Sequence, residues 1–338
     1  MYFNWLTLWI VAPSWWPARF YSKRLEKCIK NAKKLKFKLK FMKHSLNSNW
    51  YISDSPQNRA EDIHQAFVDP EVDIVMTMIW GNHSLQVLKY LDYDLIKRNF
   101  KPFVGFSDIT VLHYAIISQI WKQTYYGPAF MTQFWDLRKE LVNYTFWYFE
   151  KVVVKKQRNV IVQSSKYYID DFVDWAEESR YRKLYVNKWQ RWLKRWKAIW
   201  QIIWWCIPSL NRVLGTRYWI SPKDKIFFID IPEGHCRIDE WLEIPDVDAC
   251  FAQLDNVGLF DEIKGLVISI PYRYTEKMKK DFEDLILYYT RWKDYPILMD
   301  VNIWHIDPIV SIPYLSNVLL DSEKDLFVLN CEKTWKVG

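Results

Sequence analysis

A serine at a sharp turn is the residue whose setting in this chain most favours covalent chemistry. In the stretch KPFVGFSDITVLHYAI, an apolar strand ends at Val104, a glycine permits a tight turn, and Ser107 precedes an apolar helix. A serine at such a corner exposes its hydroxyl at the carboxyl end of a sheet, where backbone N–H groups can stabilise an oxyanion. Because the second glycine of G-x-S-x-G is missing, a helix-capping role for Ser107 stays open beside that of a nucleophile.

A serine nucleophile needs a base, and the base needs an acid that orients it. His305 follows the apolar run YPILMDVNIW, which places it at a strand end. The run KIFFID ends at Asp230, and Glu233 comes three residues later, so either carboxylate could orient the histidine. His83, in WGNHS, is a further candidate to line the site. The histidines at positions 44, 64 and 113 are expected on helix or loop surfaces.

The elements around Ser107 alternate between strands and helices. Apolar runs predict strands over 6–11, 73–78 and 103–104, and helical spacing predicts helices over 18–34, 55–67 and 109–119. Ser55 is placed to cap the second of these helices, with Pro56 at its first position. Such alternation predicts an α/β fold with a parallel sheet and helices on both faces.

A second compact unit is expected after a connector rich in aromatic and basic residues. It has predicted strands over 226–229, 266–270 and 297–299, and predicted helices over 247–257 and 276–289. The predicted organisation is an N-terminal parallel-sheet α/β domain over 1–135 with the nucleophile, a connector over 136–200, and a smaller C-terminal α+β domain over 201–338. The last would carry the histidine and the acid, with the active site between the domains.

The composition is that of a globular protein, since half of the 338 residues are hydrophobic and 26% are charged. Residues 19–43 hold eleven Lys and Arg against one acid, within a net charge of +7. No nucleic-acid-binding motif accompanies this block, so we interpret it as a solvated helix followed by a lysine-rich edge strand, LKFKLKF, and expect no nucleic-acid partner.

Cysteine usage and hydropathy indicate the compartment. The five cysteines are odd in number and form no C-x-x-C pair, which favours a reducing environment without a disulfide framework. His235 lies beside Cys236, but no second ligand pair has zinc-like spacing, so we expect no metal and no organic cofactor. The apolar N-terminus is short and interrupted by Pro13, which argues against a signal peptide or a membrane span. A cytoplasmic protein without a membrane partner is expected.

Several long segments, in order, resemble the LD-carboxypeptidases of the serine peptidase S66 family. They include IVAPS, RAEDIHQAFVDPEVD, KPFVGFSDIT, LNRVLGTRYW, KIFFIDIPEG, GLFDEIKGLVIS and HIDPIVSIP. The resemblance runs through almost the whole chain, which makes it more specific than any single motif.

The resemblance implies a site residue by residue. Ser107 matches the nucleophile of the family, and His305 matches its base. Asp230 stands where the family has a glutamate, and Glu233 is the alternative acid. The family's oxyanion hole implies the backbone of Asp108 together with a Gly-Gly turn that here is Trp80-Gly81.

The implied reaction is hydrolysis of an L,D-amide bond through an acyl-enzyme, releasing D-Ala from murein tetrapeptides in peptidoglycan recycling. A homodimer is also implied. The PEG segment and the pair Asp174-Trp175 are nearer the microcin-immunity branch, so hydrolysis of peptidyl or acyl nucleotides is an alternative. A second alternative is an inactive, binding homologue.

Tryptophan is abundant in the chain and glycine is scarce. There are 21 Trp and 8 Gly, where about 24 Gly would be typical of this length. Trp stands where the family has Gly at positions 5, 50, 80, 121, 189, 196, 200, 204, 205 and 304. Glycine adopts left-handed backbone without a steric penalty, whereas tryptophan does not. The hypothesis is that many of these tryptophans correspond to UGA codons, which the source organism reads as glycine and which the printed sequence gives as tryptophan. The alternative is a diverged chain that is genuinely rich in tryptophan.

Overall fold

A computed structural model describes residues 3, 5–15, 20–79, 81–176, 180–207, 209–234, 239–303 and 305–332, with the backbone alone at 204 and 205. The chain divides into two compact units. Unit 1 consists of Met1–Lys155, Val173–Tyr181 and Arg212–Ile220, and unit 2 of Lys156–Phe172, Arg182–Asn211 and Ser221–Gly338.

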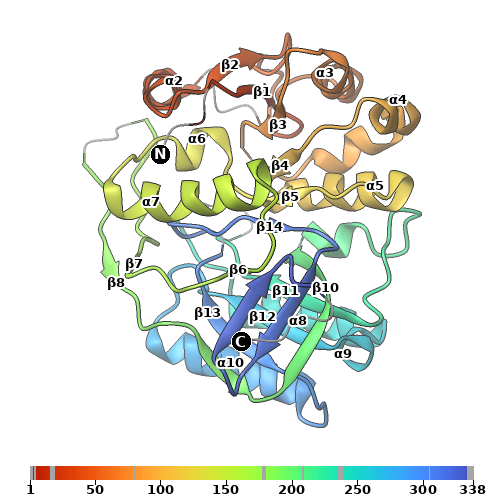
Figure 1. Cartoon of the computed structure of the whole chain (residues 1–338), viewed down its shortest axis with the longest axis vertical. Helices are drawn as coiled ribbons and strands as arrows, with labels where there is room; N and C mark the ends of the chain where they lie inside the picture. The colour runs from red at the N-terminus through yellow and green to blue at the C-terminus, as the bar shows by residue number, and fades with distance from the viewer. Residues whose placement is uncertain are drawn as a thin grey trace. The chain divides into compact units, whose positions relative to one another are not determined.

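Unit 1 is built on a parallel sheet with the strand order β5-β4-β3-β1-β2 (Figure 1). The predicted strands over 6–11, 73–78 and 103–104 are confirmed as β1, β3 and β4. The lysine-rich β2 is an edge strand, as predicted, and lysines on an edge hinder pairing with other chains. The strands are β1 (Thr7–Val11), β2 (Lys38–Phe41), β3 (Ile74–Thr77), β4 (Phe103–Gly105) and β5 (Tyr125–Tyr126).

The helices of unit 1 cover this sheet. In α3, Ser55 Oγ accepts a hydrogen bond from Asn58 N at 3.2 Å and Pro56 opens the helix, which confirms the predicted cap. Apolar side chains of α3 and α5, such as Phe67 and Leu112, pack with Val75 of β3 in one buried cluster. The helices are α2 (Ser22–Lys34), α3 (Pro56–Val68), η1 (Ser84–Tyr90), α4 (Tyr93–Arg98), η2 (Ser107–Ile109), α5 (Thr110–Ile120), α6 (Phe130–Gln133), α7 (Lys139–Tyr148) and the π-helix η3 (Phe149–Val154).

Unit 2 contains, among the described residues, an eight-stranded sheet with the order β6-β16-β15-β10-β11-β12-β13-β9. Its centre, β10 to β13, is parallel, and the outer strands are antiparallel. The predicted strands over 226–229, 266–270 and 297–299 are confirmed as β11, β12 and β13. The strands of this sheet are β6 (Val160–Ile161), β9 (Arg191–Lys194), β10 (Lys197–Cys206), β11 (Lys225–Asp230), β12 (Gly265–Ser269), β13 (Ile297–Val301), β15 (Asn317–Asp321) and β16 (Leu326–Leu329). The strands β7 (Tyr167–Tyr168) and β8 (Tyr185–Val186) pair with each other, and β14 (Ile312–Pro313) is not part of the eight-stranded sheet.

Helices connect the parallel strands of unit 2. The helix α8 lies between β11 and β12 in the chain, α10 lies between β12 and β13, and the two helices pack together (Figure 1). Every residue of β12 is buried, as expected of a strand with both faces covered. Because β11 and β12 are parallel neighbours, their last residues, Asp230 and Ser269, reach the same edge of the sheet. The helices are η4 (Ser209–Arg212), α8 (Ile244–Asn256), α9 (Leu259–Glu262) and α10 (Glu276–Thr290).

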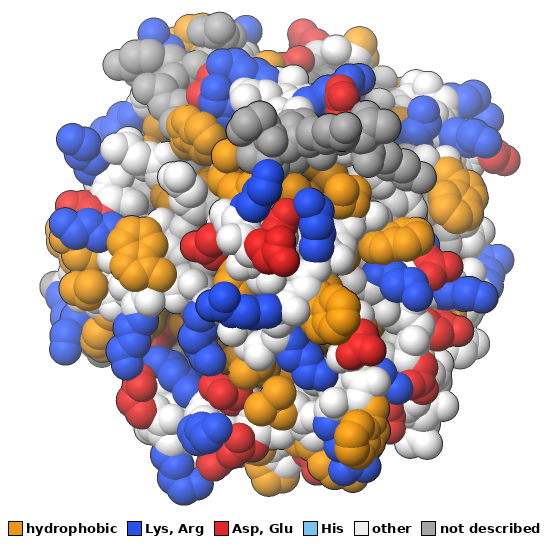
Figure 2. All heavy atoms as spheres, turned by 60° about the horizontal axis from the view of Figure 1, so that its bottom comes forward, with side chains coloured by type: hydrophobic (Ala, Val, Ile, Leu, Met, Phe, Trp, Pro, Cys, Tyr) orange, Lys and Arg blue, Asp and Glu red, His pale blue; other side chains and the backbone are white. Residues whose placement is uncertain are grey.

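On the face shown in Figure 2, Lys and Arg side chains are interspersed with acidic and apolar ones. Within the described ranges, no helix combines the length and the apolar character needed to cross a membrane.

Candidate active site

Ser107 lies at the corner between β4 and the helical segment that leads into α5. Its backbone is left-handed, with φ 58°, and its side chain is nearly buried. A non-glycine residue in this conformation costs on the order of 1 kcal/mol, so the surrounding packing must hold it there. The N-cap of α5 is Ile109, so Ser107 does not take the capping position that the sequence left open.

Gly105 lets the strand end close to its neighbour. A β-carbon at this position would lie 2.6 Å from Thr77 Oγ1 and 2.9 Å from Ile109 Cγ2. Any side chain would therefore push β3 and the corner apart, which explains the glycine two residues before the serine.

The side chain of Asp108 ties the corner after β4 to the loop after β3. Its Oδ2 accepts hydrogen bonds from Ser14 Oγ and from the backbone N–H of Ser84, both at 2.8 Å. Its Oδ1 pairs with Arg212 Nη1 at 3.0 Å. Ser14 Oγ in turn accepts from the N–H of His83 at 2.9 Å. Because Asp108 is fully buried, these contacts fix the backbone beside Ser107.

Gly81 packs directly on this network. A β-carbon on Gly81 would lie 2.3 Å from Ser14 Oγ and 3.0 Å from Ser14 Cβ. The preceding residue of the predicted oxyanion turn, Trp80, lies outside the described residues.

Replacing Gly81 with alanine should destabilise the protein by displacing Ser14 from Asp108. We expect the free energy of unfolding to fall by about 1–3 kcal/mol, the usual cost of overpacking. Urea denaturation of the wild-type protein and the variant measures this difference in the free energy of unfolding. The cost should shrink in a Ser14→Gly background, since the closest contact, with Ser14 Oγ, is then absent and the 3.0 Å approach to Trp15 Cβ remains. An equal cost in both backgrounds would contradict this account.

In unit 2, His305 forms a buried pair with Asp230. His305 Nδ1 lies 2.6 Å from Asp230 Oδ2, and Ser269 Oγ donates to Asp230 Oδ1 at 2.9 Å. Both side chains of the pair are at most 1% exposed. Although aspartate is one methylene shorter than glutamate, it reaches the ring. The contact fixes the ring orientation, and Nε2 is the nitrogen on the opposite side of the ring.

Glu233 approaches the other nitrogen of the same ring. Its Oε2 lies 3.2 Å from His305 Nε2. Burial alone lowers the pKa of His305, but the carboxylates of Glu233 and Asp230 together raise it above its ordinary value. The two acids predicted from the sequence thus occupy opposite sides of the imidazole, and only Asp230 contacts Nδ1.

Cys206, Asp230 and His305 are the residues in the described part of the chain whose donor atoms could converge on a metal ion. These atoms lie within 4.8 Å of one another. However, two ligands of a tetrahedral zinc ion lie about 3.3 Å apart, since each Zn–N or Zn–O bond is about 2 Å. The 2.6 Å between His305 and Asp230 fits a direct hydrogen bond instead. His235 and Cys236 lie outside the described residues.

The other histidines differ in their settings. The ring of His83 packs on Tyr51, with 4.7 Å between centroids, and burial lowers the pKa of His83. The expectation of a surface position for His113 is wrong. His113 is buried in α5, 3.1 Å from Gly105 O, and burial lowers its pKa to about 3. It stays neutral and holds the end of β4.

Three supporting residues were not found from the sequence: Ser14, Arg212 and Ser269. Ser14 and Ser269 lie at or just after strand ends, which is a signal that could have found them. Arg212 had no local signal, because its partner Asp108 is 104 positions away in the chain.

Two family models match the chain. The LD-carboxypeptidase N-terminal domain matches residues 9–127, and the LD-carboxypeptidase C-terminal domain matches residues 205–320. YocD of Bacillus subtilis, which bears a carboxypeptidase name, is 28% identical over 281 residues, 83% of this chain and 82% of its own. The microcin C7 self-immunity protein MccF of Escherichia coli is 31% identical over 154 residues, 45% of this chain and 44% of its own.

Solved structures share the fold. MccF without ligand has a TM-score of 0.87 at 21% identity, with 96% of each chain covered. An MccF-like protein from Bacillus anthracis has a TM-score of 0.86 at 26% identity, again with 96% of each chain covered. Other MccF structures hold aspartyl sulfamoyl adenosine or glutamyl sulfamoyl guanosine. One is of an active-site variant in which alanine replaces a serine, an asparagine and a lysine.

Proposed function

The chain belongs to the LD-carboxypeptidase family, peptidase S66, and on that premise we propose that it is a serine peptidase that cleaves an L,D-amide bond. The proposed substrate is a murein tetrapeptide, from which it releases the C-terminal D-Ala. The observation that carries the proposal is the buried contact of 2.6 Å between His305 and Asp230, which suits a catalytic base and its orienting acid.

Each residue has a role in the proposed reaction. Ser107 Oγ attacks the amide carbonyl, and His305 Nε2 takes the hydroxyl proton and delivers it to the leaving amine of D-Ala. Water then attacks the acyl-enzyme, with His305 again as the base. Asp230 keeps the Nδ1–H tautomer and stabilises the imidazolium. The backbone N–H of Asp108 and the turn at Gly81 would hold the oxyanion.

The assay that tests this proposal follows D-Ala released from a murein tetrapeptide. A tetrapeptide that ends in L-Ala is the matched control, since an enzyme for L,D bonds should leave it intact. Release from both peptides would contradict L,D specificity. If alanine were released from neither peptide, the remaining candidates would be hydrolysis of another conjugate and a binding role without hydrolysis.

A second candidate is hydrolysis of an acyl or peptidyl nucleotide. It is favoured by the local identity of 31% to MccF, whose structures hold aminoacyl sulfamoyl nucleosides. Trp175 of unit 1, from the pair Asp174-Trp175 that resembles the microcin-immunity branch, is buried beneath Arg24, whose guanidinium lies 3.9 Å from the ring centroid. Release of the amino acid from an aminoacyl sulfamoyl nucleoside, faster than D-Ala from the tetrapeptide, would select this candidate.

The proposal includes the cytoplasmic location and the homodimer that the sequence implied. A murein fragment taken up for recycling is a substrate that such an enzyme would meet inside the cell. Cell fractionation tests the location, and light scattering of the purified protein tests the assembly.

Replacing Glu233 with glutamine should shift the acid limb of the pH profile to lower pH. His305 must be neutral to act as a base, so activity falls as the pH drops through its pKa. Glu233 raises that pKa, and glutamine removes the charge at nearly the same size. The profile of kcat/KM measures the shift. A shift to higher pH would show that Glu233 does not stabilise the imidazolium.

A further inference from the structure

Four exposed tryptophans have a left-handed backbone. They are Trp5 with φ 63°, Trp50 with φ 56°, Trp121 with φ 53° and Trp189 with φ 71°. Between 50 and 84% of each residue is exposed, so packing offers little to offset the clash of their β-carbons with the backbone. Glycine, which has no β-carbon, occupies this conformation freely.

Other tryptophans of the described chain behave differently. Trp9, Trp135 and Trp175 are buried, and none of them has a positive φ. Trp135 is only 1% exposed, and Arg24 and Lys27 lie over its ring. In this second group, the buried side chain explains why tryptophan occupies the position. In the first group, the left-handed backbone favours glycine, and the exposed side chain makes little contact that would offset the strain.

Trp121 occupies a position that helices commonly give to glycine. The helix α5 ends at Ile120, and the N–H of Trp121 donates to Ile117 O at 2.9 Å. The left-handed residue that follows a helix in this way is usually glycine. The residue exposes 74% of its surface, which is the opposite of what a tryptophan in a core would do.

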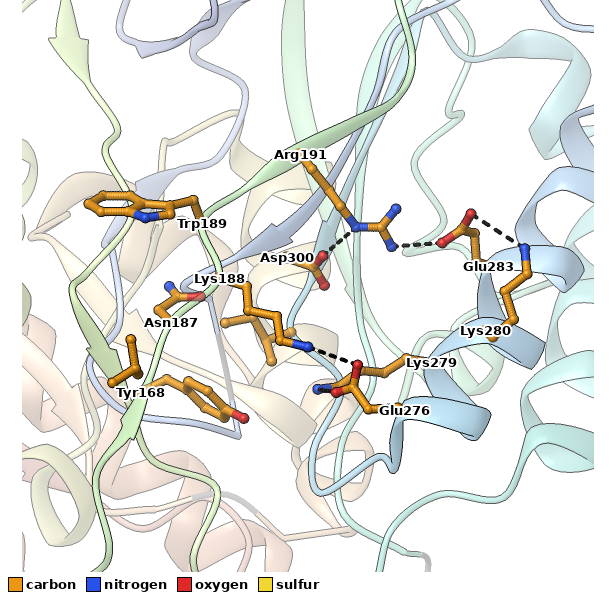
Figure 3. Close-up of a pocket in the computed structure, with 12 residues that line it drawn as sticks. Tyr168, Asn187, Lys188, Trp189, Arg191, Glu276, Lys279, Lys280, Glu283 and Asp300 are labelled. Atoms are coloured by element: carbon orange, nitrogen blue, oxygen red, sulfur yellow. Dashed lines mark hydrogen bonds and ion pairs between the residues drawn. The ribbon is translucent and has the colours of Figure 1, made fainter.

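Trp189 lies at the rim of a cavity of about 360 Å³ in unit 2 (Figure 3). The charged side chains of this cavity pair with one another, for example Lys188 with Glu276 and Arg191 with Asp300. Figure 3 shows the indole of Trp189 directed away from them. Its ring therefore adds nothing to the ion pairs, whereas its left-handed backbone turns the chain between β8 and β9.

Composition agrees with these positions. The chain has 8 Gly and 21 Trp, and only Gly215 and Gly258 of the described glycines have a positive φ. The codon UGA means stop in the standard code, tryptophan in some lineages and glycine in others. We propose that codons 5, 50, 121 and 189 are UGA and that the cell which makes this protein inserts glycine there.

The first test is the gene together with the protein from its own cells. We expect UGA at codons 5, 50, 121 and 189, and UGG at codons 9, 135 and 175. Mass spectrometry of peptides from the native protein should give the mass of glycine at the first four positions. UGG codons there, or peptides with the mass of tryptophan, would overturn the proposal.

The second test is the thermal stability of glycine and alanine variants made in a host with the standard genetic code. At each of the four positions, the glycine variant should melt about 2 °C or more above the alanine variant, because alanine keeps the clashing β-carbon. Trp292, which is 81% exposed but lacks a positive φ, is the matched control. There, glycine should melt no higher than alanine. Alanine variants that equal the glycine variants at the four positions would contradict the requirement for glycine.

Discussion

Alanine at position 107 should reduce D-Ala release by at least about 10³-fold, since in the proposed reaction the Ser107 hydroxyl forms the acyl-enzyme. The loss should appear in kcat, with the tetrapeptide still bound, because the serine hydroxyl contributes to the reaction more than to binding. Single-turnover release of D-Ala measures the chemical step, and calorimetric titration of the tetrapeptide measures binding.

A glycine variant of the same residue gives the control for folding. Because Ser107 has φ 58°, glycine should relieve strain and raise the melting temperature, whereas alanine keeps the strain. Both variants should be inactive. If the alanine variant released D-Ala at the wild-type rate, Ser107 would not be the nucleophile. If the glycine variant were less stable than the alanine variant, the backbone at position 107 would not be strained.

Asparagine at position 230 should lower kcat by about 10⁴-fold, the loss expected when the base takes the wrong tautomer. The amide N–H₂ of asparagine would donate to His305 Nδ1, so the ring proton would move to Nε2, the nitrogen that has to accept one. The measurement is kcat at the plateau of the pH profile, where ionisation of the histidine no longer limits the rate.

Two further variants distinguish the role of Asp230 from that of Glu233. Glu233→Gln should keep its plateau kcat within a few-fold, since Glu233 contacts Nε2 and not Nδ1. Asp230→Glu should lose roughly 10²-fold, because the longer side chain must displace a ring already 2.6 Å away in a fully buried site. If Glu233→Gln is as damaging as Asp230→Asn, the roles assigned to the two acids are reversed.

The strands β4 and β11 were predictable because each is a short apolar run, and β11 also has a polar residue at its end. The pattern KIFFID predicts β11 and Asp230 at its end, and SPQNRAEDIHQAF predicts α3 with Ser55 as its cap. Such signals are local, since they depend on side chains a few positions apart.

The choice between Asp230 and Glu233 was not predictable in the same way. Both follow one strand within three residues, and the contact depends on the orientation of the His305 ring, which its left-handed backbone and burial determine. His113 shows the same limit. A polar residue in an apolar helix suggests exposure, but its partner, Gly105 O, lies in the adjacent strand end.

The assignment of Arg212–Ile220 to unit 1 bears on how the protein is made by the ribosome. Asp108 is buried, and its cation, Arg212, emerges 104 residues later. Until that segment is synthesised, the nascent unit 1 must leave this carboxylate hydrated or bury it without its counter-charge, which is costly. The N-terminal half should therefore remain incompletely folded through about the first two-thirds of translation, and a fragment that stops at the end of α7 should never reach the native packing around Ser107.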